Sequence, residues 1–420
     1  MQQEIEWVVK SDDGTFWMSL EDMLTNFYSI NVCMTRHPKY NPVPWFESRR
    51  KFCFHYLEDD NNNNDDDDKR LSVPIFIMTV MHPGHFIVAV HQEDTRCHGA
   101  KPYIDIGVTV LKVDPNHDST YTLVNGTGIS VERQNHSVEF EVSPGKYLLV
   151  PTTTGIKLKQ QLELDKAIAV GDIAPPPKQL LQRDSEGKIE FTDDVQNIFW
   201  DLFDRMDHDG DDLLNKAELD HFMVLAGLEP LQDNVFQWLI HNFEPPHTEG
   251  LSRQGFINAQ LFFLENVDSE EEKLIKEFQH LGYNDRLQLI NARGAVLSVH
   301  GTVEMTLNSI PFDPKVFEEA IELPILQHGE VTKYEGGKVC LHRYRGGYGG
   351  VSFVVANNHN HPLKFEMDCS GGKNIISHRA SLKHEEVIPA GECSIMHHLA
   401  PADTRAGSWS WSYTASYMFM

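Results

Sequence analysis

Apolar and polar positions follow two different periods along this chain. Short runs of alternating apolar and polar residues, typical of β-strands, fill two stretches, from about residue 45 to 164 and from about residue 294 to the end. Between them apolar residues recur at intervals of three and four, which indicates amphipathic helices. This order predicts a multidomain chain with two antiparallel β-sandwiches separated by an α-helical region.

The expected strands are short and are separated by turn residues. In the first strand-rich stretch they cover residues 51–56, 75–80, 86–90, 106–111, 137–142 and 147–151. In the second they cover residues 296–299, 339–342, 350–355, 363–367, 386–388 and 409–413, with turns at the glycine pairs 346–347 and 371–372. Ahead of both, two strands at residues 6–9 and 14–18 and a helix capped by Ser19 form a unit too small to bury its own core.

The helical region predicts two helix–loop–helix units. In the first unit, the helix before the loop has apolar residues at Val195, Ile198, Phe199, Leu202, Phe203 and Met206. The helix after the loop has them at Leu219, Phe222 and Met223. In the second unit, the helix before the loop has apolar residues at Leu231, Val235, Trp238 and Leu239. The helix after the loop has them at Phe256, Ala259 and Phe263. A stiff proline-rich linker at residues 173–178 precedes both units and marks a domain boundary.

The loop of the first unit, residues 207–218, has the spacing of an EF-hand calcium loop. Side-chain oxygens at positions 1, 3, 5, 9 and 12 and a backbone carbonyl at position 7 supply the ligands of a hard cation. The candidate calcium ligands are Asp207, Asp209, Asp211, Leu213 through its carbonyl, Asn215 and Glu218. Position 6, where a sharp turn favours glycine, is Asp212, and aspartate reaches the left-handed region at a modest cost.

The loop of the second unit, residues 244–255, has lost these ligands. Gly255 stands where the bidentate glutamate belongs, so we expect no calcium there and a structural role as the partner of the first hand.

Composition restricts the classes of function and the compartment. The net charge of −26, from 36 basic and 62 acidic residues, argues against a nucleic-acid partner and suits a cation-binding protein. The six cysteines form no C-x-x-C pair, which favours a reducing compartment. The first ten residues contain Glu4, Glu6 and Lys10 and do not suit a signal peptide, and no apolar run reaches the length that spans a bilayer. We therefore expect a cytoplasmic protein.

Part of the chain resembles the calpains. Residues 12–24, and above all Phe16-Trp17-Met18-Ser19, are similar to the segment that closes the papain-like catalytic core of that family. Residues 90–94, 103–107 and 143–151 resemble the calpain-type β-sandwich that follows it. The catalytic Cys, His and Asn of calpains lie upstream of the first segment, so the resemblance implies that this chain carries no catalytic residue.

The helical region resembles the EF-hand-associated module of the mitochondrial Rho-type GTPases, on residues 250–256, 261–263 and 278–289. That resemblance implies a ligand-bearing hand, a silent partner and a helix that fills the groove of the pair, here through Leu274, Ile275, Phe278 and Leu281. No P-loop occurs, so no GTPase part is implied.

Four other features allow a functional and a plain structural interpretation. An acidic insertion at residues 58–68 is either a calcium- or lipid-responsive loop, as in the calpain sandwich, or a solvated hairpin tip. The histidines His342, His359, His361, His397 and His398 are metal ligands or, more commonly, ordinary polar residues. The basic and aromatic residues 343–348 form a nucleic-acid or phospholipid contact or, as the acidic total favours, a simple hairpin. The aromatic residues 409–419 belong to the core or to a docking face.

These observations predict five regions. They are a remnant of the calpain protease core (1–40), a calpain-type β-sandwich (41–165), a proline-rich linker (166–190), an EF-hand pair with its groove-filling helix (191–290) and a second β-sandwich (291–420). The expected function is that of a non-catalytic, calcium-binding regulatory or scaffold protein. Two alternatives remain open: the distal half of a calcium-dependent cysteine protease, and a structural component of a ciliary or cortical cytoskeleton. Expected partners are proteins, either a calpain-type catalytic chain or cytoskeletal proteins, together with a phospholipid contact.

Overall fold

The computed structural model describes residues 19, 45–57, 70–94, 102–127, 135–161, 178–183, 188–265, 270–290, 292–310, 312–345, 350–379, 381–402 and 408–420. Its contacts divide the chain into two units, Met1–Pro44 and Trp45–Met420. Apart from Ser19, the expected protease-core remnant lies outside the described residues, as do the acidic insertion and most of the proline-rich linker. Everything below concerns the second unit.

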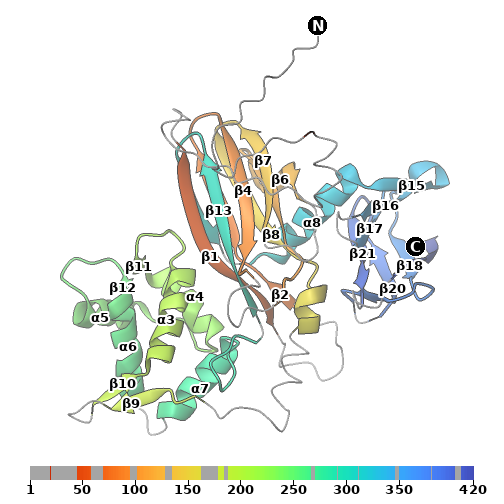
Figure 1. The fold of residues 1–420 in the computed structure, drawn as a ribbon. Coiled ribbons are helices and arrows are strands. Elements are labelled where there is room, and N and C mark those ends of the chain that lie inside the picture. Colours follow the sequence, from red (N-terminus) through yellow and green to blue (C-terminus); the bar gives the residue numbers. More distant parts are fainter. Residues whose placement is uncertain are drawn as a thin grey trace, which may run out of the picture. The chain divides into compact units, whose positions relative to one another are not determined.

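The first β-sandwich consists of two five-stranded antiparallel sheets (Figure 1). One sheet has the order β2-β1-β13-β4-β7, built from β1 (Phe46–Leu57), β2 (Arg70–Ser72), β4 (Gly84–Gln92), β7 (Asn135–Val142) and β13 (Ala292–Gly301). The other has the order β14-β3-β8-β5-β6, built from β3 (Ile75–Val80), β5 (Gly107–Asp114), β6 (His117–Gly126), β8 (Gly145–Thr152) and β14 (Met305–Ile310). The alternating apolar residues of both sheets share one core, as the strand period requires.

The expected boundary at residue 291 is wrong, because β13 and β14 belong to the first sandwich. β13 pairs with β1 over ten residues, from Phe46 opposite Gly301 to His55 opposite Ala292, and pairs with β4 on its other side. Its inward residues Ala295, Leu297 and Val299 are buried in the sandwich core. The alternation identified a strand there, but period alone does not tell which sheet a strand joins. The EF-hand region is therefore an insertion ahead of the sandwich's last two strands.

The inserted region is helical and also contains two short strand pairs and one isolated bridge between Tyr283 and Leu289. Its elements are β9 (Leu181–Arg183), β10 (Ile189–Phe191), α3 (Asp193–Met206), β11 (Leu213–Leu214), α4 (Lys216–Leu225), α5 (Asp233–Phe243), β12 (Leu251–Ser252), α6 (Arg253–Glu265) and α7 (Glu270–His280). The strand pairs are β9 with β10 and β11 with β12. The expected helix–loop–helix units are confirmed, with α3 burying Val195, Phe199 and Leu202 on one face.

A helix that the sequence analysis did not predict follows β14. α8 (Pro314–His328) is capped by Asp313, whose carboxylate accepts from the Lys315 and Val316 N–H groups at 2.9 and 3.4 Å. Its buried residues Val316, Ala320 and Ile325 have helical spacing and pack in the core of the first sandwich. The pattern was missed because Pro324 interrupts it, although the helix continues through that proline.

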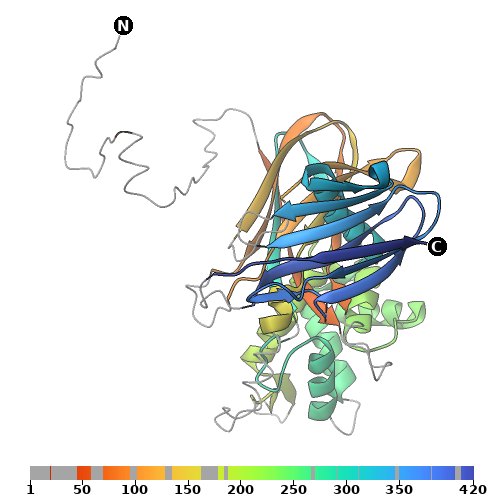
Figure 2. The same ribbon diagram turned by 90° about the vertical axis from the view of Figure 1, so that its right-hand side faces the viewer.

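The chain ends in a second β-domain (Figure 2). It contains β15 (Glu330–Tyr334), the 3₁₀ turn η2 (Glu335–Gly337), β16 (Val339–Arg345), β17 (Val351–Asn357), β18 (Leu363–Asp368), β19 (Ile375–Ser377), β20 (Lys383–Ile388), β21 (Cys393–Pro401) and β22 (Thr414–Phe419). The sheets have the orders β15-β16-β17-β21-β19 and β20-β18-β22, and they enclose a separate apolar core. Among the described residues, no helix has the length and apolar character needed to span a membrane.

Candidate calcium site

The predicted calcium loop joins α3 to α4, and the start of α4 is fixed by the loop itself. Asn215 is the N-cap residue, and its Oδ1 accepts from the N–H groups of Ala217 and Glu218 at 2.9 and 3.2 Å. Glu218 completes a capping box, since its Oε2 accepts from the Asn215 N–H at 2.9 Å. The residue expected to close the ligand set therefore has a fixed orientation.

The structure brings the acidic side chains of the loop together. Carboxylate oxygens of Asp207, Asp209 and Asp211 lie within 4.8 Å of one another, the one such group found among the described residues. Asp207 Oδ1 accepts from the Gly210 N–H at 2.6 Å, and its Oδ2 accepts from the Asp212 N–H at 3.1 Å. The loop is thus wrapped around the carboxylate of its first position.

The side chain of Glu218, at the end of the loop, is buried. It is 3% exposed, and its Oε1 accepts from the N–H groups of His208 and Asp209 at 2.7 and 3.3 Å. Burial raises the pKa of Glu218 to about 7, against the lowering effect of these donors, and burial also raises the pKa of Asp207. The group of carboxylate oxygens within 4.8 Å of one another does not include Glu218, but a buried carboxylate near the charge of Asp209 is costly unless a proton or a cation compensates its own charge.

The missing glycine at position 6 does not prevent the turn. Asp212 has a φ of 61°, in the left-handed region that the turn requires, and Gly210 has a φ of 74°. An aspartate there costs roughly 1 kcal/mol or more in backbone strain. The expectation that aspartate closes the loop is confirmed.

The donor set fits a calcium ion. It consists of four carboxylates, the Asn215 amide oxygen and the Leu213 carbonyl, all hard oxygen donors from one short loop. Leu213 lies in β11 at the expected seventh position, and its N–H donates to Asp211 Oδ1 at 2.8 Å. Sulfur and imidazole, which favour zinc and copper, are absent from the set.

The second hand is closed by a side chain of its own loop. Leu214 and Leu251 are opposite each other where β11 pairs with β12, and both are fully buried. In the second loop, Glu244 Oε1 accepts from the N–H and Oγ of Ser252, both at 2.7 Å. A Cβ placed on Gly255 would collide with that same oxygen. The carboxylate of Glu244, the first residue of this loop, therefore lies where the side chain of a larger residue at position 255, the twelfth of the loop, would begin.

The apolar face of the pair is already filled by α7. Leu274, Phe278 and Leu281 are at most 3% exposed and belong to the same core as both hands. The Phe278 ring lies 5.4 Å from that of Phe199 on α3. The predicted groove-filling helix is confirmed in position.

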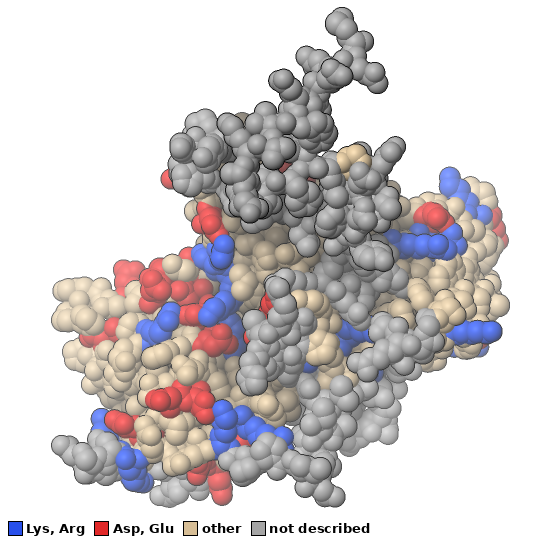
Figure 3. Space-filling model, viewed as in Figure 1, with Lys and Arg blue, Asp and Glu red and all other residues tan. Residues whose placement is uncertain are grey.

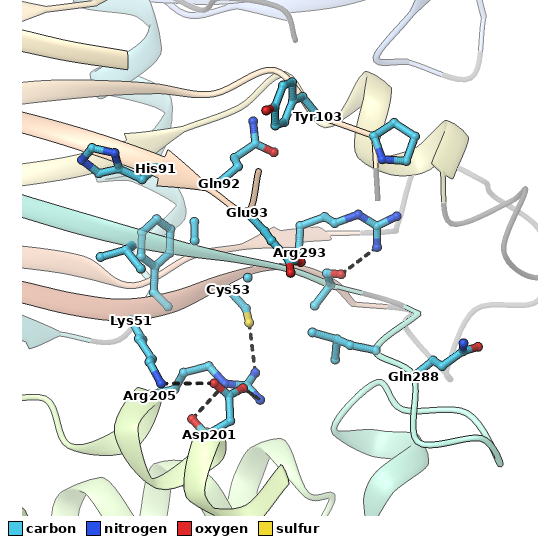
Figure 4. Close-up of a pocket in the computed structure, with 17 residues that line it drawn as sticks. Lys51, Cys53, His91, Gln92, Glu93, Tyr103, Asp201, Arg205, Gln288 and Arg293 are labelled. Atoms are coloured by element: carbon cyan, nitrogen blue, oxygen red, sulfur yellow. Dashed lines mark hydrogen bonds and ion pairs between the residues drawn. The ribbon is translucent and has the colours of Figure 1, made fainter. Parts of the chain in front are cut away.

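A joint that the sequence did not reveal connects the pair to the first sandwich. Arg205 on α3 is 6% exposed and donates to the Cys53 thiol of β1 at 3.0 Å (Figure 4). It also donates to the Tyr283 hydroxyl at 2.6 Å. Nearby, Lys51 Nζ lies 2.7 Å from the carboxylate of Asp204. These contacts border a pocket of about 660 Å³ between the sheet and the pair, over β1, β4 and β13. No local spacing predicts such pairs, since their members lie far apart in the sequence.

Charge is unevenly distributed around the joint (Figure 3). Acidic side chains gather over the EF-hand pair, and basic ones lie beside them at the edge that faces the sandwich (Figure 3). The basic residues of β1 that contact α3 or its loop are Arg50 and Lys51.

Among the described residues, the candidate histidines do not form a group of metal ligands. His397 is fully buried with its Nδ1 2.9 Å from Ser377 Oγ, and His398 Nδ1 lies 2.6 Å from Ser352 Oγ. His359 instead stacks near His361 and Phe419. His397, His398 and His359 therefore have contacts of the kind found in cores and turns, and the interpretation of the histidines as ordinary polar residues stays a prediction.

The fold and the site define a multidomain, β-rich chain that is calpain-like and EF-hand-related. Residues 325–420 match the family model "Calpain-D-like, C-terminal domain". The chain is 24% identical over 281 residues to "EF-hand calcium-binding domain-containing protein 7" of Homo sapiens, covering 66% of this chain and 42% of that protein. The Mus musculus protein of the same name is 27% identical over 259 residues, covering 61% and 38%.

A calpain is also among the relatives. "Calpain-5" of Rattus norvegicus is 27% identical over 166 residues, covering 36% of this chain and 26% of that protein. The chain thus spans less than half the length of the curated relatives it matches. The resemblance to Rho-type GTPases is not shown by these comparisons and stays a prediction.

Proposed function

We propose that this chain is a non-catalytic, calpain-related regulatory or scaffold protein that binds one calcium ion in residues 207–218. The observation that supports it best is the ligand group of Asp207, Asp209 and Asp211 together with the buried Glu218 carboxylate of the same loop. The names of its relatives, an EF-hand calcium-binding protein and a calpain, point to the same chemistry.

The filled groove determines how such a chain would respond. Sensors with two EF-hands act by exposing an apolar groove for a target helix. Here Phe278 and Leu274 occupy that groove within the chain itself. Calcium would therefore stiffen the module and its joint with the sandwich, and would expose no target groove.

The described cysteines support a non-catalytic role. A thiol nucleophile needs a lowered pKa and an activating histidine. Burial instead raises the pKa of Cys53 and Cys393, and raises that of Cys369 to about 12. The Cys53 thiol accepts from Arg205 at 3.0 Å, and the Cys393 thiol donates to the Glu322 carboxylate at 3.2 Å, so neither of these contacts is with a histidine.

Calorimetric titration of the full chain tests the calcium site. One ion should bind per chain, and Glu218→Gln should abolish binding because it removes a charged donor. Glu249→Gln, at an exposed position of the silent loop, is the matched control and should leave the titration unchanged. Two sites, no site in the wild type, or full binding by Glu218→Gln would contradict the proposal.

A casein cleavage assay with calcium tests the absence of catalysis. No thiol-dependent cleavage is expected. Cleavage lost on replacing any one of the six cysteines would overturn the non-catalytic assignment.

A second candidate is the distal, regulatory part of a calcium-dependent cysteine protease. The similarity to calpain-5 over 26% of that protein's length favours it. A calpain-type catalytic chain would then be a partner in the cytoplasm, and calcium-dependent co-purification of cleavage activity would support it. Recovery in a detergent-resistant cytoskeletal fraction, with and without chelator, would instead support the scaffold role.

A further inference from the structure

We propose that Arg50, on strand β1 of the first sandwich, is a positioning residue of the calcium loop. Calcium affinity would then depend on the contact between the EF-hand pair and the sandwich. This inference rests on the proposed function of residues 207–218 and adds to it a means of regulation by the neighbouring domain.

The guanidinium of Arg50 connects three parts of the chain. Its Nη2 donates to the carbonyl of Asp209 at 2.9 Å and to that of Leu307 at 3.1 Å. Its Nε donates to the carbonyl of His208 at 3.4 Å. Because Arg50 lies in one sheet of the sandwich and Leu307 in the other, the guanidinium joins the loop to both sheets.

The carbonyls of His208 and Asp209 each belong to a peptide group whose N–H donates a hydrogen bond to a candidate calcium ligand. The peptide that carries the His208 carbonyl donates its N–H, that of Asp209, to Glu218 Oε1 at 3.3 Å. The peptide that carries the Asp209 carbonyl donates its N–H, that of Gly210, to Asp207 Oδ1 at 2.6 Å. Hydrogen bonds in series polarise one another, and those to a charged donor are the stronger ones. Arg50 therefore orients the first and last carboxylates of the loop through one peptide each.

The loop approaches Arg50 closely at Gly210. A Cβ on Gly210 would lie 2.7 Å from Arg50 Nη2, and the φ of 74° also disfavours any side chain. The glycine that stands at position 4 thus fits both the turn and the contact with the sandwich.

A cation beside the loop also repels a calcium ion, and this effect has the opposite sign. The repulsion acts through solvent-exposed space and is screened, and it is offset by the five carboxylates of the loop (Asp207, Asp209, Asp211, Asp212 and Glu218). The hydrogen bonds act at contact distance on two of the ligands. Positioning should therefore outweigh repulsion. If it does, removal of Arg50 weakens calcium binding, whereas dominant repulsion would make the binding tighter.

Calcium titration of full-length Arg50→Met, beside Lys51→Met, tests this proposal. Lys51 lies on the same strand, and its described ion pairs are with Asp204 at 2.7 Å and Asp201 at 3.6 Å, both on α3 and outside the loop. Removing Arg50 should weaken calcium binding about five- to tenfold, within the usual range of coupling between sites. Lys51→Met should change affinity less than twofold, although both variants loosen the same interface.

Unchanged or tighter binding by Arg50→Met would overturn the proposal, as would equal weakening by Lys51→Met, because the effect would then belong to docking in general. Gly210→Ala provides a second test that leaves Arg50 in place. It should weaken binding more in the wild type than in Arg50→Met, because part of its cost is the collision with the guanidinium; equal weakening in both backgrounds would contradict that. A wild type that binds no calcium would overturn the proposed function together with this inference, whereas normal wild-type binding with an unaffected Arg50→Met would overturn this inference alone.

Discussion

Replacing Asn357 by leucine should selectively destabilise the C-terminal β-domain. This asparagine is fully buried at the end of β17. Its Nδ2 donates to the carbonyls of His361, Ile388 and Pro389 at 2.9, 3.0 and 2.9 Å, and its Oδ1 accepts from the His359 N–H at 3.1 Å. One side chain thus ties the turn after β17 to the end of β20.

The size of the effect follows from the groups that lose their partner. Leucine has a similar volume, so no large cavity forms, but it offers neither donor nor acceptor. Two N–H groups serve three carbonyls, so at least two full bonds are lost, together with the one to His359. At about 1–3 kcal/mol for each of these three lost bonds, the free energy of unfolding should fall by at least about 3 kcal/mol. In a domain of this size, that lowers the melting temperature by roughly 10 °C or more.

Calorimetry combined with amide hydrogen exchange measures the loss where it occurs. Exchange should accelerate in β17 and β20 and remain unchanged in the EF-hand pair, since the two regions have separate cores. Asn358→Leu is the matched control, because that residue is exposed and its Nδ2 donates to the Gly337 carbonyl at 3.0 Å. It should cost less than about 1 kcal/mol. Equal losses from both variants, or a loss below 1 kcal/mol from Asn357→Leu, would refute the reasoning.

Three further predictions concern the silent hand, the joint and the buried histidines. Gly255→Glu should leave calorimetric stoichiometry at one ion per chain, because Glu244 occupies the required space; a second site would contradict this. Arg205→Met should lower stability by about 2–4 kcal/mol in chemical denaturation, because Tyr283 and Cys53 lose their buried partner, whereas Arg253→Met, at a surface pair with Asp204, should cost less than about 1 kcal/mol. Burial lowers the pKa of His397 to about 4 and of His398 to about 3, so the folded state binds fewer protons than the unfolded state below pH 6.5. Stability of the C-terminal domain should therefore fall as pH drops from 6.5 toward 4, by up to about 1.4 kcal/mol per pH unit for each histidine, and a melting temperature that is equal at pH 7.5 and 5.5 would exclude this.

The features that the sequence predicted well are those set by neighbouring residues. The calcium loop, the two helix–loop–helix units and the groove helix each depend on spacings within about fifteen residues, where turn geometry and helical period apply directly.

The features that the sequence did not predict depend on long-range pairing. Alternation marks residues 296–299 as a strand, but the neighbours of that strand, β1 and β4, lie some two hundred residues earlier in the chain. The contact of Arg50 with Asp209 spans 159 positions, and an arginine in a strand carries no local mark of its partner. α8 was missed for a different reason, because a proline within the apolar period indicates an interruption that packing against the sandwich overrides.

The position of the EF-hand pair within the chain determines how the calcium loop is attached to the first sandwich. The module enters after β8 and leaves into β13, which lies in the middle of a sheet between β1 and β4. A central strand has ladder bonds on both sides and is among the last elements to open. The exit of the module is therefore anchored in the most stable part of the sandwich, while Arg50 and Arg205 fix its first hand to β1. Because the module is attached at both places, a change in the order of the calcium loop should affect the sheet as well. We therefore expect amide hydrogen exchange in β1 and β13 to slow on addition of calcium.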